Sequence, residues 1–376
     1  MPLQHKPIME MFDTGVTVFG APGRYIQGQG AWRLVGDCAA TLGARAVLVI
    51  DATIRDMLAG QLEESCAAAG VELQILSFAG HLGAATGAEL QAQLDGAVAA
   101  VLAAGGGRAI DAGKALAEQL GSGLITLPTV ASNDAPTSKN FVLYEDGHRM
   151  LEVRHLMRNP DFVIVDTDIL SKAPKALFRA GMGDALAKKF EAEACFNSGG
   201  GTMFLARSTR LAHQIADTCY ETLMRHGAGA WAVVGTGNVT EDFDAAVEAM
   251  ILMAGLGFES GGLSLPHALT RGIPLLPGGG DVLHGIQVAW ALIVHFEALG
   301  FEPPPELVRL YNVVGLPLSL QEMGVAVPSR AQLAAVAEAT LAVRHIKNLP
   351  LILDAEALID AILRVEEKAP ARSACA

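Results

Sequence analysis

The segment VAAVLAAGGGRAIDAGKALAEQLG, residues 98–121, places three consecutive glycines between an apolar run and a stretch with helical periodicity. The apolar run is typical of a buried β-strand, and the stretch after the glycines is typical of an amphipathic helix. Glycines at such a junction let the backbone approach a pyrophosphate, and the helix N-terminus offers free N–H groups to an anion. A plain strand-to-helix turn also fits, because the segment lacks the GxGxxG fingerprint.

On both sides of this segment, short β-rich runs alternate with helical stretches. The runs are ARAVLVID (44–51), VELQILSF (71–78), GLITLPT (123–129) and PDFVIVD (160–166). This alternation predicts an α/β domain with a doubly wound parallel sheet. After about residue 174 the chain becomes rich in Ala, Leu and Glu with 3.6-residue periodicity. We therefore expect an α/β domain over 1–173 and an all-α domain over 174–376.

Composition excludes several classes of protein. The 376 residues carry a net charge of −13, which disfavours a nucleic-acid partner. The longest strictly apolar run, AVAAVLAA (97–104), is far shorter than the roughly 20 residues of a spanning helix, so no membrane partner is expected. The start lacks a secretion signal, and the five cysteines form no CxxC motif. We expect a cytoplasmic protein with reduced thiols, in which any metal site uses histidines and carboxylates.

One carboxylate and two histidines are candidates for such a site. Asp184 stands in GMGDALAKKFEAEA, where a helix cap is the simpler interpretation. His267 and His284 bracket the loop in SLPHALTRGIPLLPGGGDVLHG (264–285), and buried core histidines also occur in such settings. One carboxylate and two imidazoles would leave a fourth position open, as catalytic zinc sites do. Ligands so far apart carry no spacing signature, so the pattern alone leaves both interpretations open.

Two polar features are expected beside the glycines. The loop LPTVASNDAPTS (127–138) follows a predicted strand, where open α/β sheets bind ligands, and it contains Asp134. Asp51 ends the strand 44–51, where a carboxylate can bind a ribose diol and would repel a 2′-phosphate, favouring NAD over NADP. Both features also fit ordinary turn residues.

Taken in order, GGGRAID, LPTVASNDAPTS, NPDFVIVDTDIL, GMGDALAKKFEA, GLGFESGGLSLPHALTRG and LHGIQVAWAL resemble the iron-containing alcohol dehydrogenase superfamily. The resemblance runs from about Pro22 to about Arg364 and is greatest to the glycerol dehydrogenase branch. It implies an N-terminal NAD-binding α/β domain and a C-terminal helical, metal-binding domain. It also implies a homo-oligomer, often an octamer, and a small polyol as the substrate.

The resemblance implies a role for thirteen residues. Asp184, His267 and His284 match the metal ligands, which hold zinc in the glycerol enzymes, although iron or another divalent metal also suits the superfamily. Asp134 matches the carboxylate that contacts the glycerol hydroxyls. Together with the three metal ligands, it forms the expected catalytic and substrate-binding set. The expected NAD-binding residues are Gly105, Gly106, Gly107 and Asp111 at the pyrophosphate, Thr129, Ser132, Ser138 and Tyr144 near the nicotinamide half, and Asp51 at the ribose.

The chain departs from the superfamily pattern at three residues, and the loop before His284 also reads PGGGD where a longer polar stretch is usual. Arg108 follows the glycines where Lys is frequent, Thr270 replaces a second histidine in HALTRG, and Asn140 stands where Leu is usual. These departures leave the metal set intact and bear on substrate preference.

The implied reaction is oxidation of glycerol to dihydroxyacetone, with hydride transfer to NAD⁺ from an alcohol activated by the metal. The alternatives are a dehydrogenase of a glycerol phosphate, a lyase like 3-dehydroquinate synthase, and a non-enzymatic protein that binds NAD or a metal. The first two require a basic cluster for a phosphate, and few basic residues surround Asp184 in the sequence.

Overall fold

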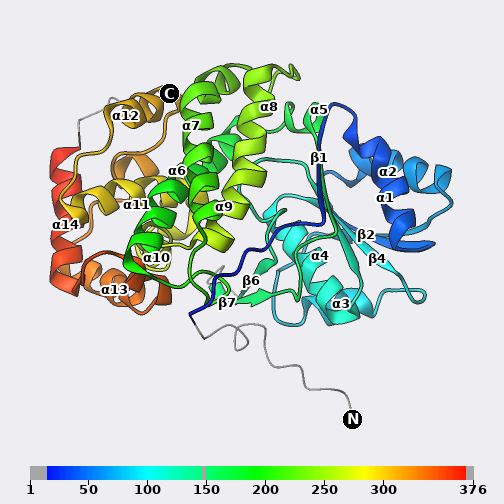
Figure 1. Cartoon of the computed structure of the whole chain (residues 1–376), viewed down its shortest axis with the longest axis horizontal. Helices are drawn as coiled ribbons and strands as arrows, with labels where there is room; N and C mark the ends of the chain where they lie inside the picture. Colours follow the sequence, from blue (N-terminus) through cyan, green and yellow to red (C-terminus); the bar gives the residue numbers. More distant parts are fainter. Residues whose placement is uncertain (1–14, 146–149, 370–376) are drawn as a thin grey trace, which may run out of the picture. The chain divides into compact units, whose positions relative to one another are not determined.

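The computed structural model describes residues 15–145 and 150–369, which form two compact units (Figure 1). Unit 2 comprises Gly20–Phe178 and Ala232–Gly255, and unit 1 contains the remaining described residues. These units differ from the two continuous segments expected, 1–173 and 174–376, because residues 232–255 pack with the sheet-containing unit. Each unit is described by itself below.

Unit 2 is built on a six-stranded sheet in the order β1-β8-β5-β4-β2-β3, with every neighbouring pair parallel. The strands are β1 (Arg24–Gly28), β2 (Arg45–Asp51), β3 (Glu72–Phe78), β4 (Ala100–Gly105), β5 (Gly123–Pro128) and β8 (Phe162–Asp166). Its helices are α1 (Val35–Leu42), α2 (Arg55–Ala68), α3 (Thr86–Gln91), α4 (Gly107–Leu120), α5 (Thr167–Leu170) and α8 (Glu241–Glu248), with the 3-10 turn η2 (Ala31–Leu34). The predicted doubly wound parallel sheet is confirmed.

Apolar side chains cover both faces of this sheet, because alternate strand residues point to opposite sides. On one face, Leu48 and Leu102 pack with Trp32 and Leu62 beneath η2 and α2. The opposite face contributes Val47, Val49, Val101 and Ala103 to a core shared with α3 and α4. Strands buried on both faces explain why these runs read as continuously apolar in the sequence.

Two strand features of unit 2 were not predicted. The edge strand β1 is only five residues long, RYIQG, and only half-buried, so its hydrophobic pattern is weak. A separate antiparallel pair, β6 (Asn140–Tyr144) and β7 (Met150–His155), follows the polar loop. Residues 140–155 contain charged and exposed positions that hid the strand periodicity.

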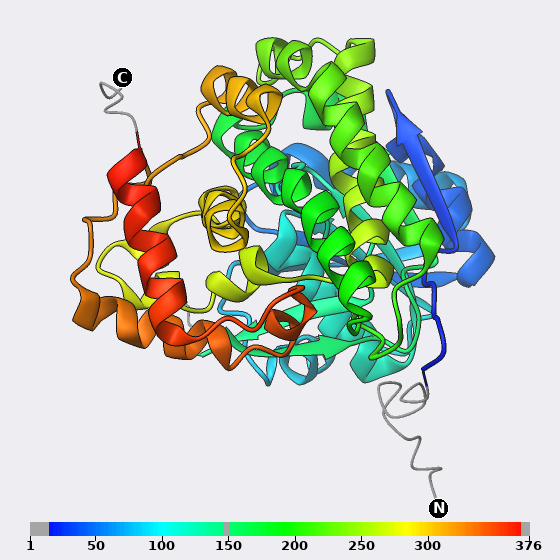
Figure 2. The same ribbon diagram turned by 60° about the vertical axis from the view of Figure 1, so that its left-hand side comes forward.

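Unit 1 is helical, as expected for the second half of the chain (Figure 2). Its main helices are α6 (Lys175–Ser198), α7 (Arg210–Val233), α9 (Ala254–Gly261), α10 (Leu265–Leu269), α11 (His284–Leu299), α12 (Pro305–Val314), α13 (Arg330–Leu341) and α14 (Ala355–Lys368). It also holds the 3-10 turns η4 (Ile273–Leu275), η5 (Gly279–Asp281), η6 (Gln321–Met323) and η7 (Arg344–Asn348). Side chains of α10, α11, α13 and α14 form an apolar core, which includes Leu269, Trp290, Leu333 and Ile362.

Two further features bear on the sequence expectations. Cys38, Cys66, Cys195 and Cys219 are buried free thiols, and Cys375 lies outside the described residues. In the described part of the chain, no single helix has the length and hydropathy to cross a membrane, although one bent pair, Glu241–Gly261 with Leu265–Leu275, meets those criteria jointly.

Candidate active site

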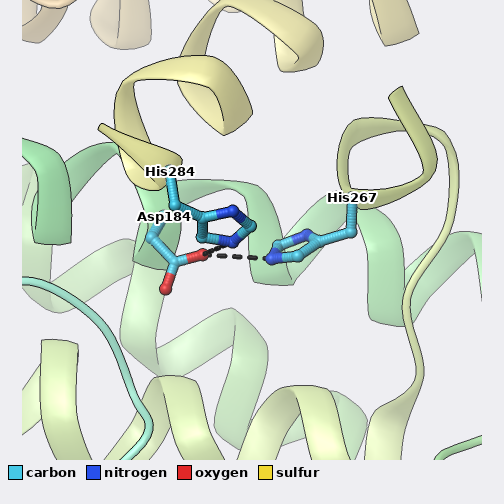
Figure 3. A group of neighbouring side chains, drawn as sticks. All are labelled: Asp184, His267 and His284. Carbon is cyan, nitrogen blue, oxygen red and sulfur yellow. Dashed lines mark hydrogen bonds and ion pairs between the residues drawn. The ribbon is translucent and has the colours of Figure 1, made fainter. Parts of the chain in front are cut away.

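Asp184, His267 and His284 bring one ligand atom each to a common point in unit 1 (Figure 3). His267 Nε2 lies 3.1 Å from Asp184 Oδ1, and His284 Nε2 lies 4.0 Å from the same oxygen. All three ligand atoms lie within 4.8 Å of one another. Asp184 and His267 are buried, whereas the His284 side chain is 45% exposed. The cluster is thus buried on one side and open on the other.

Close helix packing brings His284 to Asp184. His284 is the first residue of α11, and Gly285 follows it directly. A Cβ atom on Gly285 would lie 1.9 Å from the Ala180 carbonyl oxygen, and one on Gly183 would lie 2.4 Å from the Gly285 carbonyl oxygen. Only glycine permits this approach of α6 and α11. The glycines in GMGD and LHG are therefore part of the site's construction, since they set the separation of two candidate ligands.

Glu191 holds His267 from the side opposite Asp184. Its Oε2 lies 2.6 Å from His267 Nδ1, and its Oε1 accepts hydrogen bonds from the backbone N–H groups of Ser264 (2.9 Å) and His267 (3.1 Å). Glu191 is fully buried. A carboxylate at Nδ1 leaves Nε2 directed at Asp184, the arrangement by which metal-binding histidines are usually oriented.

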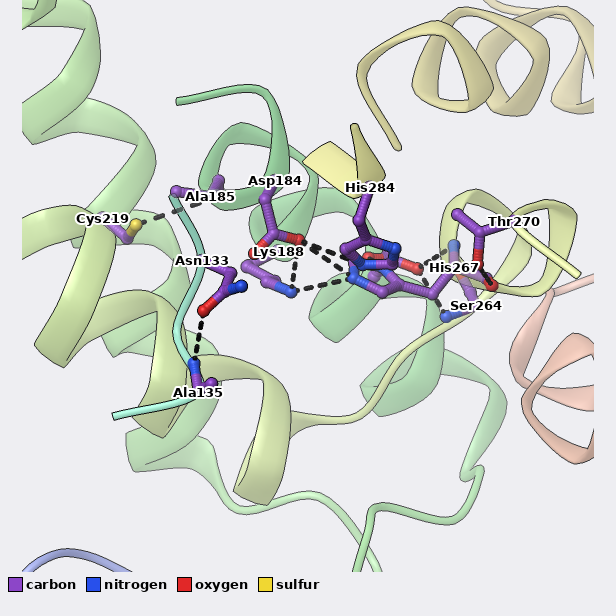
Figure 4. A network of polar contacts seen from close by, with 11 residues as sticks. Asn133, Ala135, Asp184, Ala185, Lys188, Cys219, Ser264, His267, Thr270 and His284 are labelled. Atoms are coloured by element: carbon purple, nitrogen blue, oxygen red, sulfur yellow. Dashed lines mark hydrogen bonds and ion pairs between the residues drawn. The ribbon is translucent and has the colours of Figure 1, made fainter. Parts of the chain in front are cut away.

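Sequence reasoning missed Glu191 and its neighbour Lys188. Lys188 Nζ lies 3.0 Å from Asp184 Oδ1 and 2.9 Å from His267 Nε2 (Figure 4). The spacing of Asp184, Lys188 and Glu191, at i, i+4 and i+7, places all three on one face of α6. That spacing was visible in DALAKKFE. Three charged residues on one helical stripe, one of them a metal-ligand candidate, are the signal that could have drawn attention to them.

The charges of this network shift the pKa values of its members. Burial opposes ionisation of Asp184, but Lys188 and His267 hold its pKa well below the usual range. Burial also opposes ionisation of Glu191, whose pKa His267 and Lys188 nevertheless lower to about 2. Burial alone would lower the pKa of His267, but the Glu191 carboxylate, together with the hydrogen bonds to Asp184 and Glu191, raises it to about 9. Both carboxylates are therefore ionised at neutral pH.

The donor set fits a divalent cation. With Nδ1 donating to Glu191, the two atoms that face each other across 3.1 Å are a carboxylate oxygen and His267 Nε2. Asp184 Oδ1 is an acceptor, and Nε2 becomes one when His267 gives up its second proton, so a divalent cation between them would bind both atoms. Two imidazoles and one carboxylate match the three-ligand pattern of catalytic zinc sites, with the exposed side of His284 leaving room for a further ligand.

The glycine loop lies at the carboxyl edge of the sheet in unit 2. Gly105 ends β4 with φ +145, and α4 begins at Gly107. A Cβ atom on Gly105 would lie 2.7 Å from Ala109 Cβ and 3.0 Å from Asp51 Cβ. One on Gly107 would lie 2.6 Å from the side-chain nitrogen of Asn133. The predicted loop, Asp51 and the polar loop 127–138 are therefore adjacent, and the exposed backbone at a helix N-terminus suits a pyrophosphate.

Buried hydrogen bonds hold the polar loop in place. Lys114 of α4 donates to the carbonyl oxygens of Ala135 (2.6 Å) and Asn140 (2.5 Å). Thr137 Oγ1 donates to the Ile251 carbonyl oxygen at 2.7 Å, in the π-helical turn η3 (Ala249–Met253) that follows α8. A π-helical turn weakens the regular helical ladder and makes a carbonyl available. Residues 232–255 thus support the loop.

The other predicted cofactor residues take varied positions in unit 2. Asp111 is buried, accepts a hydrogen bond from Val142 N–H (2.9 Å) and pairs with Lys114 at 3.6 Å. Asp51 Oδ1 accepts hydrogen bonds from the N–H and hydroxyl of Thr53. The remaining residues lie on the polar loop or at the end of β6: Thr129, Asp134 and Ser138 are buried, and Ser132 and Tyr144 are half-buried.

The three departures occupy distinct surroundings. Arg108 lines a cavity of about 210 Å³ with Tyr144 and His81. Asn140 Oδ1 lies 2.5 Å from His155 Nδ1, which fixes the start of β6 against the end of β7. Thr270 is buried, and its hydroxyl donates to the His267 carbonyl oxygen at 2.8 Å. Thr270 therefore supports the backbone of a metal-ligand candidate.

Comparisons with known proteins agree with this architecture. Residues 26–174 match the family model described as iron-containing alcohol dehydrogenase. The chain is 36% identical to the glycolaldehyde reductase of Halobacterium salinarum, over 93% of this chain and 97% of the relative. It is also 36% identical to the glycerol dehydrogenase of Thermotoga maritima, over 86% of this chain and 88% of the relative. Among solved structures, glycerol dehydrogenase from Schizosaccharomyces pombe superposes with a TM-score of 0.89 at 27% identity, over 95% of this chain and 92% of that one.

Proposed function

Because the chain belongs to the iron-containing alcohol dehydrogenase family, we propose that it interconverts glycerol and dihydroxyacetone with NAD⁺ and NADH. The observation that carries the proposal is the cluster of Asp184, His267 and His284, with Glu191 orienting His267. The glycine loop beside Asp51 supports NAD as the cofactor. The balanced reaction takes glycerol and NAD⁺ to dihydroxyacetone, NADH and a proton.

When bound, a divalent cation supplies the Lewis acidity that lowers the pKa of an alcohol hydroxyl, and NAD⁺ supplies the hydride acceptor. Asp184, His267 and His284 would hold the cation, for which zinc suits two imidazoles and one carboxylate, and iron or another divalent metal is the alternative. Glu191 keeps the His267 proton on Nδ1, so that Nε2 serves as a ligand. The backbone of Gly105, Gly106 and Gly107 would bind the pyrophosphate.

Polyol selectivity would come from the polar loop. Asp134 is a buried carboxylate at the carboxyl edge of the sheet, held there by the bonds of the loop to Lys114 and Ile251. We propose that it accepts hydrogen bonds from a hydroxyl next to the reacting carbon, which favours a 1,2-diol over a simple alcohol. The 36% identity to a glycolaldehyde reductase makes glycolaldehyde a second candidate substrate, since its reduction is the same hydride transfer run in reverse.

The test is NADH absorbance after mixing the purified protein with NAD⁺ and glycerol, before chelation, after chelation, and after zinc is restored. We expect NADH that depends on glycerol, disappears on chelation and returns with zinc, and a much lower rate with 1-propanol. NADH oxidation with glycolaldehyde ranks the second substrate. No turnover with any small diol or hydroxyaldehyde by zinc-loaded protein would reject the proposal. Light scattering of the same sample tests the homo-oligomer, including the octamer, expected from the family resemblance.

A further inference from the structure

Lys188 places a buried ammonium group on the two atoms that would ligate the metal. Its Nζ lies 3.0 Å from Asp184 Oδ1 and 2.9 Å from His267 Nε2, and the residue is 1% exposed (Figure 4). Lys188 follows Asp184 by one turn of α6, so the helix itself delivers the ammonium to the carboxylate. The contact is built into the fold and does not depend on a flexible surface side chain.

A metal and this ammonium compete for the same positions. Metal bonds to oxygen and nitrogen are about 2.0–2.2 Å long, so a cation bonded to both Asp184 Oδ1 and His267 Nε2 would lie at most about 4 Å from Nζ. Two cations that close in a buried site repel each other strongly, because little water screens them. Metal binding therefore requires the ammonium to leave these two atoms.

The ammonium also compensates charge that the site would otherwise carry alone. Asp184 and Glu191 are both buried carboxyl groups, and Lys188 Nζ contacts Asp184 Oδ1 and His267 Nε2 directly. The ring of Phe258, whose centroid lies 5.0 Å from Nζ, adds a cation–π contact to the ammonium in this position.

We propose that Lys188 is an intramolecular competitor of the metal, which sets the metal affinity of the site and stabilises the ligand set before the metal enters. This inference rests on the metal dependence in the proposed function. It predicts opposite effects of one substitution. Removing the ammonium strengthens metal binding, whereas it destabilises the protein when no metal is bound.

The experiment measures zinc affinity and thermal unfolding of Lys188→Met, with zinc alone as the probe. A chromogenic chelator competes for zinc at equilibrium, and the unfolding temperature is recorded with excess chelator and with saturating zinc. We expect Lys188→Met to bind zinc at least tenfold more tightly than the unmodified protein. With excess chelator, the unfolding temperature of Lys188→Met should be lower than that of the unmodified protein. The rise in unfolding temperature on adding zinc should be larger for Lys188→Met.

Lys189→Met is the matched control. Lys189 is the next residue of α6, but its Nζ pairs with Asp217 at 2.5 Å and lies 5.7 Å from the centroid of the Tyr220 ring. Its loss removes the same charge from the same helix, so we expect zinc affinity within twofold of the unmodified protein. Lys188→Gln serves as a second variant if the methionine side chain prevents folding, because its amide still donates a hydrogen bond to Asp184.

Unchanged or weaker zinc binding by both Lys188 variants would overturn the inference. An equal loss of unfolding temperature with and without zinc would also overturn it, because that pattern describes a residue that only stabilises the fold. If zinc affinity is unchanged while the unmodified protein still oxidises glycerol in a zinc-dependent manner, only the inference about Lys188 fails. If no variant binds zinc and no NADH forms, the proposed function fails with it.

Discussion

The two candidate binding regions of this chain are built in different ways. The glycine loop of unit 2 is a local structure, in which three consecutive residues join one strand to one helix and present backbone groups. The candidate metal-ligand cluster of unit 1 is assembled from side chains on three helices, 83 and 17 residues apart in the sequence (184 to 267, and 267 to 284). Ligand binding at a local backbone site is sensitive to an added Cβ atom. Ligand binding at a site built from dispersed side chains is sensitive to the loss of one charged group.

Loss of the Asp184 charge is the change with the largest expected effect. Asp184→Asn keeps the size of the side chain but removes the only carboxylate of the ligand cluster. We expect kcat/KM for glycerol to fall on the order of a thousandfold or more, because several kcal/mol of charge stabilisation depends on the bound cation. NADH binding, measured by fluorescence, should change little, since the glycine loop is in the other unit.

Asp217→Asn is the control for Asp184→Asn. Asp217 pairs with Lys189 of α6 outside the ligand cluster, so its loss should leave activity within about twofold of the unmodified protein. Near-normal turnover by zinc-loaded Asp184→Asn would show that Asp184 is not a ligand. A folded protein, checked by circular dichroism, is required for either conclusion.

The residue that orients a ligand should matter less than the ligand. Glu191→Gln retains an oxygen for the Ser264 and His267 N–H groups but removes the charge that faces His267 Nδ1. We expect zinc affinity to fall by about 10- to 100-fold, the usual effect of losing a partner of a ligating histidine. Equilibrium competition with a chelator measures it. Unchanged affinity would mean that His267 is held by its backbone and by Thr270 alone.

The same contrast explains what the sequence could predict. The parallel sheet was predictable because β2, β4 and β5 are apolar on both faces, and the glycine loop because it is contiguous. Asp184, His267 and His284 carried no spacing signal, and the family resemblance identified them as a set. Lys188 and Glu191 were missed because their roles depend on α10 packing against one face of α6. The edge strand β1 and the strand pair β6 and β7 were missed because β1 and β7 are only partly buried and β6 is only five residues long.

An added methyl group at Gly105 should disturb only the local site. Gly105 has φ +145, and its Cβ would meet Ala109 Cβ at 2.7 Å and Asp51 Cβ at 3.0 Å. We expect Gly105→Ala to weaken NADH binding roughly tenfold, because the strained turn must shift away from Asp51. Zinc affinity should not change. Gly106→Ala is the control, since Gly106 has φ −80 and its Cβ would meet Val130 at an ordinary 3.4 Å. Equal losses in the two variants would refute a special role for Gly105.

Acid should weaken the helical unit around α11. His295 is buried there, and burial lowers its pKa to about 4. The unfolded chain binds the proton more readily, with a pKa near 6.5, so the stabilisation is complete above that pH and is lost as the pH falls toward 4. At pH 4 the free energy of unfolding has lost about 2–3 kcal/mol of the contribution that neutral His295 makes at pH 7. His295→Leu removes this dependence. Hydrogen exchange of α11 peptides, corrected for intrinsic rates between pH 7 and 4.5, should therefore rise more in the unmodified protein than in the variant.

The sheet unit should show the opposite pH dependence at Asp111, with a smaller effect. Burial raises the pKa of Asp111 to about 6, against the opposing influence of Lys114 and the Val142 N–H group. The folded state therefore binds the proton more readily than the unfolded state, and this group adds stability as the pH falls from about 6 toward 4. Asp111→Asn should remove that contribution, which we expect to be at most about 2 kcal/mol because Lys114 retains two carbonyl partners. In the unmodified protein, exchange of α4 peptides should slow as the pH falls over this range, while that of α11 peptides rises. Parallel changes in both helices, or the same pH dependence in Asp111→Asn, would show that the two units do not respond separately to protonation.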